Sequence, residues 1–354
     1  MAPYTLHLLV FLGTVALGFL LPSMAIRFGL VDEPDHRKLH EGTIPLVGGL
    51  MIFISYASIL GVYGYLKPAL LIALAAMLFL GLVDDHVGLS ARRRMFLQSL
   101  IVLELILVGD VKLTQLGNLA GMGVVDLGYL AVPFTLLCFV GLINAINMLD
   151  GLDGLAGGVA LSALIWLAIA NVLAGAGFCV EGIALIAALA GFMVFNARYP
   201  GHPKATIYMG DAGSTTLGMV LGYIALNQCA AQTDPLTPVS IFWVLALPVV
   251  DTLRVMIVRK LRGHSPFAAD RTHLHHLMSD LGHFSAGTVT WSLVMLNLVF
   301  GAIGVLGHYF GIQDSWLMLG ILALLVFSVM LGYFLERLPS KVVAAQKPPH
   351  EVTV

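Results

Sequence analysis

The sequence predicts an all-α, polytopic membrane protein with about eleven transmembrane helices. Of its 354 residues, 59% are hydrophobic and only 11% are charged, whereas about 25% charged residues is typical of a soluble domain. Apolar runs close to the roughly 20 residues that a bilayer-spanning helix needs recur along the whole chain. The basic residues, finally, are unequally distributed between alternate connections, as in proteins with several membrane crossings.

The predicted spans follow one another from the amino terminus. They lie at residues 5–29, 44–64, 67–83, 96–110, 130–148, 155–176, 180–197, 212–230, 238–258, 287–310 and 315–336. The first is too long for a signal-peptide core and has no basic segment before it, so it is expected to stay as a helix. The fourth is short and contains Glu104, and the orientation of everything after it depends on its being a span. Residues 1–338 thus form one predicted transmembrane domain, and residues 339–354 a tail predicted to be disordered.

The sidedness of charge predicts the orientation. When the connections are numbered alternately, all Lys and Arg residues except Lys67 and Lys112 fall on one side. The positive-inside rule makes that side the cytoplasm, which places the amino terminus outside and the carboxyl terminus inside. The clusters of acidic residues and histidines fall on the same cytoplasmic side.

The segment NAINMLDGLDG, residues 144–154, ends the fifth apolar run. Asn144, Asn147, Asp150 and Asp153 are spaced three apart, so on a helix neighbouring members lie about 60° from one another. Carboxylates beside a bilayer are energetically expensive and usually functional. The alternative is a polar helix end that only caps and solvates.

Two adjacent carboxylates, Asp84 and Asp85, close the third span ahead of the basic run 92–94. Such a pair suits Mg²⁺, which takes oxygen ligands and keeps positions for water and phosphate. One of the two could instead act as a base, with its pKa set by its neighbour. A plain helix end with salt bridges is the alternative.

Asp211 stands in the loop HPKATIYMGDAGSTTLG, immediately before the eighth apolar run. At a helix entry, exposed N–H groups and Ser214 could bind phosphate while the carboxylate holds a metal ion. The loop lacks the Lys and the spacing of a Walker motif. Asp211 could also simply be the N-cap of the helix.

The segment SPFAADRTHLHHLMSDLG, residues 265–282, is predicted to be a polar loop. It combines Arg271 with His273, His275 and His276, a compact cluster able to bond a diphosphate. Zinc is the rival interpretation, but of the further ligands that it would need only Asp270 is near.

Two weaker features accompany these clusters. Asp251 and Arg254 have the i, i+3 spacing of an ion pair, for which we expect a structural role. Lys38, beside Arg37, could contact a phosphate or serve only as a positive-inside anchor, and the pair Gly48–Gly49 permits close helix approach.

Together these residues predict metal-assisted chemistry on a soluble phosphorylated substrate, with the second substrate supplied by the membrane. An ion-coupled transporter would instead place its ionisable residues near mid-span, in broken helices of related repeats. A scaffold protein would leave the clusters without a task. Cys138, Cys179 and Cys229 stand singly in apolar runs, so neither a disulfide framework nor a thiolate metal site is indicated.

The motifs resemble those of the polyprenyl-phosphate N-acetylhexosamine-1-phosphate transferases. The matching pieces occur in family order between residues 32 and 283: IPLVGG, GLVDDHVGLS, NAINMLDGLDGLAGG, YMGDAGS and PFAADRTHLHH. The resemblance implies transfer of a sugar-1-phosphate from a UDP-sugar to a lipid phosphate, with release of UMP and with Mg²⁺, or alternatively Mn²⁺, as cofactor.

The resemblance also implies roles for individual residues. Asp84, Asp85, Asp150 and Asp153 are the expected catalytic residues, and Asp211 and Asp85 the expected metal ligands. The expected substrate-binding residues are Lys38, Asn144, Asn147, Arg271, His273, His275 and His276.

Within the family, the resemblance is strongest to members that use UDP-GlcNAc and undecaprenyl phosphate. It rests on IPLVGG, where the peptidoglycan sibling has a PTMGG-like segment, and on HLHH, where the sibling has an uninterrupted histidine triplet. Another UDP-N-acetyl sugar or UDP-MurNAc-pentapeptide stays an alternative donor. The expected setting is a bacterial inner membrane and the start of a cell-surface polysaccharide such as O antigen, with a homodimer left open and no nucleic-acid partner.

Overall fold

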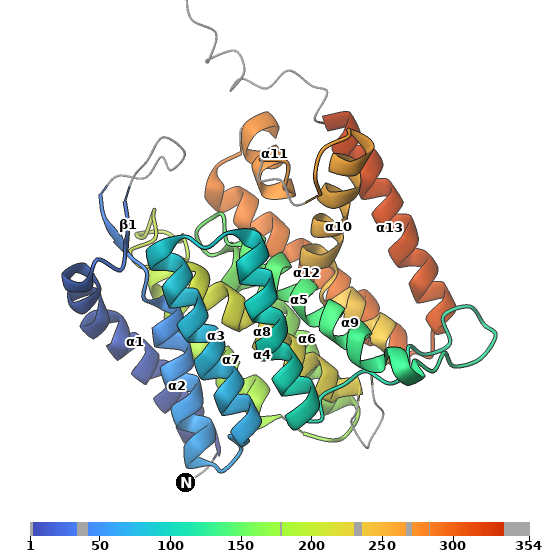
Figure 1. The fold of residues 1–354 in the computed structure, drawn as a ribbon, viewed down its shortest axis with the longest axis horizontal. Coiled ribbons are helices and arrows are strands. Elements are labelled where there is room, and N and C mark those ends of the chain that lie inside the picture. The colour runs from blue at the N-terminus through green and yellow to red at the C-terminus, as the bar shows by residue number, and fades with distance from the viewer. Residues whose placement is uncertain are drawn as a thin grey trace, which may run out of the picture.

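The computed structural model describes residues 3–33, 42–177, 179–229, 236–266, 271–282 and 284–335. In these residues the chain forms thirteen α-helices, one 3-10 helix and two short strands (Figure 1). The first helices and the strands are α1 (Pro3–Phe28), β1 (Val31–Asp32), β2 (Ile44–Pro45), α2 (Gly48–Val62), α3 (Pro68–Val87), α4 (Ala91–Val108), η1 (Gly128–Leu130) and α5 (Ala131–Leu149). They are followed by α6 (Leu155–Leu173), α7 (Val180–Asn196), α8 (Gly210–Cys229), α9 (Pro238–Val244), α10 (Ala246–Leu261), α11 (Leu274–Gly282), α12 (Ala286–Tyr309) and α13 (Asp314–Leu335).

Every predicted apolar run except the ninth coincides with a single helix, and the chain is an all-helical, polytopic membrane protein. The strands β1 and β2 add only a two-residue antiparallel pair, in which Val31 faces Pro45. Six helices in the described residues are long and apolar enough to cross a bilayer, or seven if the bent pair α9 and α10 forms one span.

The count of eleven spans therefore goes beyond what length and apolarity support. Helices α2 and α7 have 15 and 17 residues, fewer than the roughly 20 of a full crossing. Helix α4 has 18 residues but contains Arg92–Arg94 and Glu104. Helix α8 begins with the polar segment GDAGSTT. Eleven crossings remain a prediction for these helices.

The ninth run is not the single helix that was predicted. Helices α9 and α10 meet at Leu245 with a bend of 86°. Pro248 explains the break, because it has no N–H to donate to the carbonyl of Val244 and its ring would clash with that carbonyl. Asn297 of α12 satisfies the exposed backbone: its Nδ2 donates to Val244 O at 3.3 Å, and its Oδ1 accepts from Leu247 N at 3.4 Å. A neighbouring side chain thus makes a helix break tolerable inside the bundle.

Helix α8 lies at the centre of the bundle and packs against α2, α3 and α5. Two glycines let its first turn come close to the other helices. A Cβ at Gly49 of α2 would overlap the backbone of Gly213, and a Cβ at Gly81 of α3 would overlap the backbone of Ala212. The close approach predicted for the Gly48–Gly49 pair is confirmed, and together with Gly81 it brings α2 and the end of α3 that carries Asp84 and Asp85 against the first turn of α8.

The segment predicted as a polar loop at residues 265–282 is partly helical. Its second half forms α11, which places Leu274 and Met278 on one face, one turn apart. Both side chains pack on an apolar cluster that includes Leu149 and Leu155. Burial of this face stabilises a helix in a segment whose many polar residues had led to the prediction of a loop. In Figure 1, α11 lies at the same end of the bundle as the α3–α4 connection.

Candidate active site

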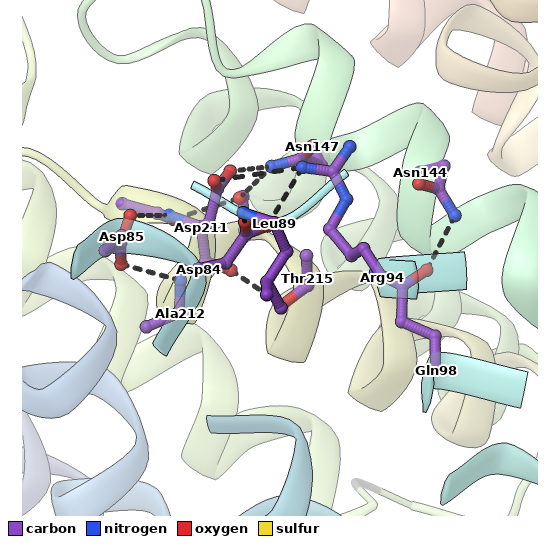
Figure 2. Close-up of polar contacts among 12 residues, drawn as sticks. Asp84, Asp85, Leu89, Arg94, Gln98, Asn144, Asn147, Asp211, Ala212 and Thr215 are labelled. Atoms are coloured by element: carbon purple, nitrogen blue, oxygen red, sulfur yellow. Dashed lines mark hydrogen bonds and ion pairs between the residues drawn. The ribbon is translucent and has the colours of Figure 1, made fainter. Parts of the chain in front are cut away.

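Asp211 stands in the first turn of α8, as predicted, but it is not the N-cap. Helix α3 supplies the cap: Asp85 Oδ1 accepts from Asp211 N at 2.7 Å, and Asp85 Oδ2 accepts from Ala212 N at 3.0 Å (Figure 2). A carboxylate on the exposed N–H groups of a helix start is favourable both as a hydrogen-bond acceptor and against the helix dipole. The two oxygens of Asp85 are therefore engaged in fixing the backbone of Asp211.

Asp84 is almost fully buried and faces the α3–α4 connection. Its Oδ1 accepts from Leu89 N at 2.6 Å, a contact made possible by Gly88, whose left-handed φ of 68° turns the chain back. Its Oδ2 lies 3.1 Å from Arg94 Nη1. Adjacent residues of one helix thus have separate tasks, because their side chains point about 100° apart.

Arg94 of α4 joins two carboxylates from different helices. Its Nη1 is 3.1 Å from Asp84 Oδ2 and 3.8 Å from Asp211 Oδ2. Arg92 and Arg93 are exposed on the same helix. The sequence showed a basic run without showing which of its arginines enters the site. Helical periodicity predicts that Arg93 and Arg94 point in different directions, but it does not tell which of them faces the carboxylates.

The two asparagines of the fifth helix have different partners. Asn147 Nδ2 donates to Asp211 Oδ1 at 2.5 Å and to Ser214 Oγ at 2.9 Å. Asn144 lies one turn deeper, where its Nδ2 donates to Gln98 Oε1 at 2.9 Å (Figure 2). Gln98 is fully buried, and no motif in the sequence had singled it out. Asn147 belongs to the carboxylate cluster, whereas Asn144 belongs to the α4–α5 contact.

Asp150 and Asp153 follow in the α5–α6 turn. Removal from water raises the pKa of the Asp150 carboxyl to about 7, and the nearby carboxylates of Asp211, Asp85 and Asp153 act in the same direction. Asp153 Oδ2 lies 2.8 Å from Arg198 Nε and accepts from Ala205 N at 3.0 Å. Asp153 therefore ties down the α7–α8 connection, while Asp150 is a carboxyl that can exchange a proton near neutral pH.

The histidine cluster reaches this turn from α11. His275 is 1% exposed, and a Cβ on Gly151 would lie 2.5 Å from its Nε2. Burial lowers the pKa of His275 to about 3 and that of His276 to about 4. Both rings are therefore neutral at pH 7 and can act as hydrogen-bonding groups rather than as cations.

Arg271 is paired within its own segment. Its Nε and Nη2 lie 3.2 Å and 3.1 Å from the two oxygens of Asp280. The Asp280 carboxylate therefore competes with a substrate phosphate for this guanidinium. Lys38 and Asp270 lie outside the described residues.

The donors present fit a magnesium ion better than a zinc ion. Within the part of the chain that the structure describes, no three His, Cys, Asp or Glu side chains are close enough to surround one metal ion. Mg²⁺ commonly uses only one or two carboxylates and takes its remaining ligands from water and substrate phosphate. Asp84 and Asp211, which already share one cationic partner, are the carboxylates placed for such a partial shell.

Comparison with known proteins agrees with this site. The model of Glycosyl transferase family 4 matches residues 68–228, which run from α3 to α8 and contain Asp84, Asp85, Asp150, Asp153 and Asp211. Over 334 residues the chain is 34% identical to the undecaprenyl-phosphate alpha-N-acetylglucosaminyl 1-phosphate transferase of Escherichia coli (strain K12), covering 93% of this chain and 89% of the relative. The chain belongs to the polyprenyl-phosphate N-acetylhexosamine-1-phosphate transferase family.

Other relatives with the same name support this assignment. Identity is 33% over 337 residues to the protein of Salmonella typhimurium, covering 93% of this chain and 89% of the relative. It is 32% over 320 residues to that of Haemophilus influenzae, covering 89% of each. The family resemblance and the enzyme class predicted from the motifs are confirmed, and the transporter alternative is not supported.

Proposed function

We propose that this transferase moves GlcNAc-1-phosphate from UDP-GlcNAc to undecaprenyl phosphate and releases UMP. The names of its relatives and the segments IPLVGG and HLHH support this choice of substrates. The observation that carries the proposal is the convergence of Asp84, Asp211 and Arg94 from three helices at one end of the bundle. The product would be the lipid-linked diphospho-sugar that starts a cell-surface polysaccharide.

The reaction exchanges one phosphoanhydride bond of the sugar phosphate, that to UMP, for another, that to the lipid phosphate. An oxygen of the lipid phosphate attacks the phosphorus that carries the sugar, the bond from that phosphorus to the bridging oxygen breaks, and UMP leaves. This chemistry needs alignment and charge neutralisation more than covalent help. Arg94 is placed to neutralise phosphate charge, since its guanidinium already bridges two anionic groups.

The remaining side chains prepare the carboxylates for this task. Asn147 holds Asp211 through its carboxamide, and Asp85 fixes the backbone beneath it. When bound, Mg²⁺, or alternatively Mn²⁺, would supply further neutralisation of the diphosphate, held by Asp211 with Asp84. Asp150, with a pKa of about 7, is suited to accept a proton from the acceptor phosphate. His275, neutral beside the α5–α6 turn, is suited to hydrogen-bond the donor substrate.

The orientation is part of the proposal. Eleven crossings would place the amino terminus outside and the carboxyl terminus in the cytoplasm of a bacterial inner membrane. The ends of α3, α5 and α8 that carry the site, and the start of α4, are on the same side as the basic connections (Figure 1). The site would then face the cytoplasm, where UDP-sugars are available, while the acceptor arrives through the membrane.

The test uses the purified protein with Mg²⁺ and undecaprenyl phosphate, and offers UDP-GlcNAc, UDP-GalNAc and UDP-MurNAc-pentapeptide in separate reactions. UMP release and a lipid-linked product with UDP-GlcNAc are expected. Asp211→Asn should abolish UMP release and product formation while still unfolding in a cooperative thermal transition. Lys112→Gln, on a connection predicted to face outward, should leave UMP release and product formation intact. Preference for another UDP-sugar would overturn the assignment of UDP-GlcNAc as the donor. Turnover by Asp211→Asn would overturn the assignment of Asp211 as a metal ligand.

A further inference from the structure

A buried ion network joins α10 to the start of α11. Its members Asp251, Arg254 and His273 are 6%, 3% and 6% exposed. Asp251 Oδ1 accepts from Arg254 Nη2 at 2.8 Å and from Leu274 N at 3.1 Å. Asp251 Oδ2 lies 2.8 Å from His273 Nδ1. The ion pair predicted from the i, i+3 spacing is confirmed, but it is only one part of this larger network.

The network fixes the orientation of one imidazole. An ionised carboxylate can only accept hydrogen bonds, so the proton of His273 must be on Nδ1, facing Asp251. In the neutral ring, the lone pair then lies on Nε2, which points away from the carboxylate. A carboxylate that orients a histidine in this way sets both its tautomer and its ring plane.

The orientation passes from His273 to the candidate active site. The rings of His273 and His275 are nearly parallel, with centroids 6.0 Å apart and an interplanar angle of 18°. His275 in turn contacts Gly151 so closely that a Cβ at that position would lie 2.5 Å from Nε2. Because Gly151 follows Asp150 directly, His273 and His275 connect the network of α10 to the turn that carries Asp150.

The last helix supports the network from behind. Arg254 Nη2 donates to Thr272 O at 2.6 Å, which ties the guanidinium to the chain entering α11. A Cβ on Gly332 of α13 would lie 2.5 Å from Arg254 Nη1. Only a glycine at this position lets α13 pack directly against the guanidinium, so α13 holds Arg254 in its place under Asp251.

We propose that Asp251 is a positioning residue for the transfer reaction: it orients His273 and docks α11 against the α5–α6 turn, so that the imidazoles meet the diphosphate of the donor substrate. This inference rests on the proposed function. Asp251 does not contact the carboxylates of the site itself. It acts through His273, with Arg254 and Gly332 as its support.

The test compares Asp251→Asn with Asp110→Asn, which makes the same chemical change in an exposed ion pair with Lys112. We expect Asp251→Asn to raise the KM for the UDP-sugar and lower kcat/KM by about 10- to 100-fold, taking as a guide the range for groups that orient metal-bound histidines. The KM for undecaprenyl phosphate should stay within about twofold of its wild-type value, because the proposed role of Asp251 concerns only the donor substrate. A purely structural defect would instead affect the kinetics with both substrates. Asp110→Asn should change neither.

Hydrogen exchange supplies a readout that is independent of turnover. Asp251→Asn should speed backbone exchange in residues 271–282 and leave exchange in the first turn of α8 unchanged. If Asp251→Asn does not fold, Gly332→Ala perturbs the same network from α13 and should give the same two changes in weaker form.

Each outcome decides the proposal. Faster exchange together with a selective rise in the KM for the UDP-sugar supports it. Unchanged exchange, or faster exchange with unchanged kinetics, or an equal loss for both substrates, overturns it. A wild-type protein that releases no UMP from any UDP-sugar would refute the proposed function instead, and the exchange result would still show whether Asp251 docks α11.

Discussion

Replacing Arg94 with glutamine tests the geometry of the carboxylate cluster most directly. Arg94 Nη1 lies 3.1 Å from Asp84 Oδ2 and 3.8 Å from Asp211 Oδ2, so in the metal-free protein it balances two anionic groups. The variant would leave these carboxylates facing each other without that cation. We therefore expect the metal-free variant to be less stable than the wild type.

The size of the effect follows from distance and exposure. Two unit charges about 4 Å apart interact by about 4 kcal/mol at an effective dielectric constant of about 20. The side chain of Asp84 is 3% exposed and that of Arg94 is 21% exposed, so water screens the pair only in part. Part of the gain is offset by desolvation of the arginine, which leaves an expected loss of about 2 to 3 kcal/mol in the free energy of unfolding.

Mg²⁺ should reverse this loss, because it would bind the same two carboxylates. Binding to the folded state alone stabilises by RT ln(1 + [L]/Kd), and the variant has no guanidinium competing for the site. Thermal unfolding in detergent, with either EDTA or Mg²⁺, measures both the destabilisation of the metal-free variant and the stabilisation by Mg²⁺. We expect Mg²⁺ to raise the Tm of Arg94→Gln clearly more than that of the wild type.

The matched control is Arg93→Gln, an exposed arginine on the same helix, which should unfold like the wild type in both conditions. An equal Mg²⁺ shift for Arg94→Gln and wild type would refute the reasoning. It would show that the arginine and the metal ion do not share ligands.

Three further changes test other parts of the structure. Asp85→Ala removes the cap of α8 and should lower the free energy of unfolding by about 1 to 2 kcal/mol and abolish most UMP release. Asp85→Asn can still accept one of the two hydrogen bonds and should lose less of both. Equal losses for the two variants would contradict the capping role. Asn297→Leu leaves the carbonyl of Val244 unsatisfied at the helix break and should lower stability by about 1 to 3 kcal/mol, which an unchanged Tm would disprove. The pKa of His275, about 3, means that its ring stays neutral above about pH 5. The KM for the UDP-sugar of His275→Gln, divided by that of the wild type, should therefore be the same at every pH between about 5.5 and 8.5. If the ring were cationic instead, the wild-type KM would rise as pH increases through about 6.5.

Much of the site was visible in the sequence because a bilayer simplifies the problem. Each apolar run must become a helix, and successive helix ends alternate between two faces. Asp84, Asp150 and Asp211 could therefore be placed on one face from the order of the runs alone. Their close approach in the structure also requires Gly81, which lets α3 touch the first turn of α8.

Features that depend on contacts between distant segments were missed. The break at Leu245 satisfies its backbone through Asn297, about fifty residues further along the chain. Helix α11 is stabilised by burial on residues of α5, α6 and α12, although its sequence looks like a polar loop. The spacing of Asp251 predicted an ion pair, but its bond to His273 crosses from one element to another and has no local signature.

The sequence by itself determined the class of protein, the helices and the face on which the charged groups gather, because burial in a membrane acts on every residue of a run in the same way. Only the tertiary structure decided which donor each carboxylate receives. Asp84 and Asp85 are neighbours in the chain, yet one accepts from Arg94 and the other caps α8, since adjacent side chains of a helix point in different directions and meet different neighbours.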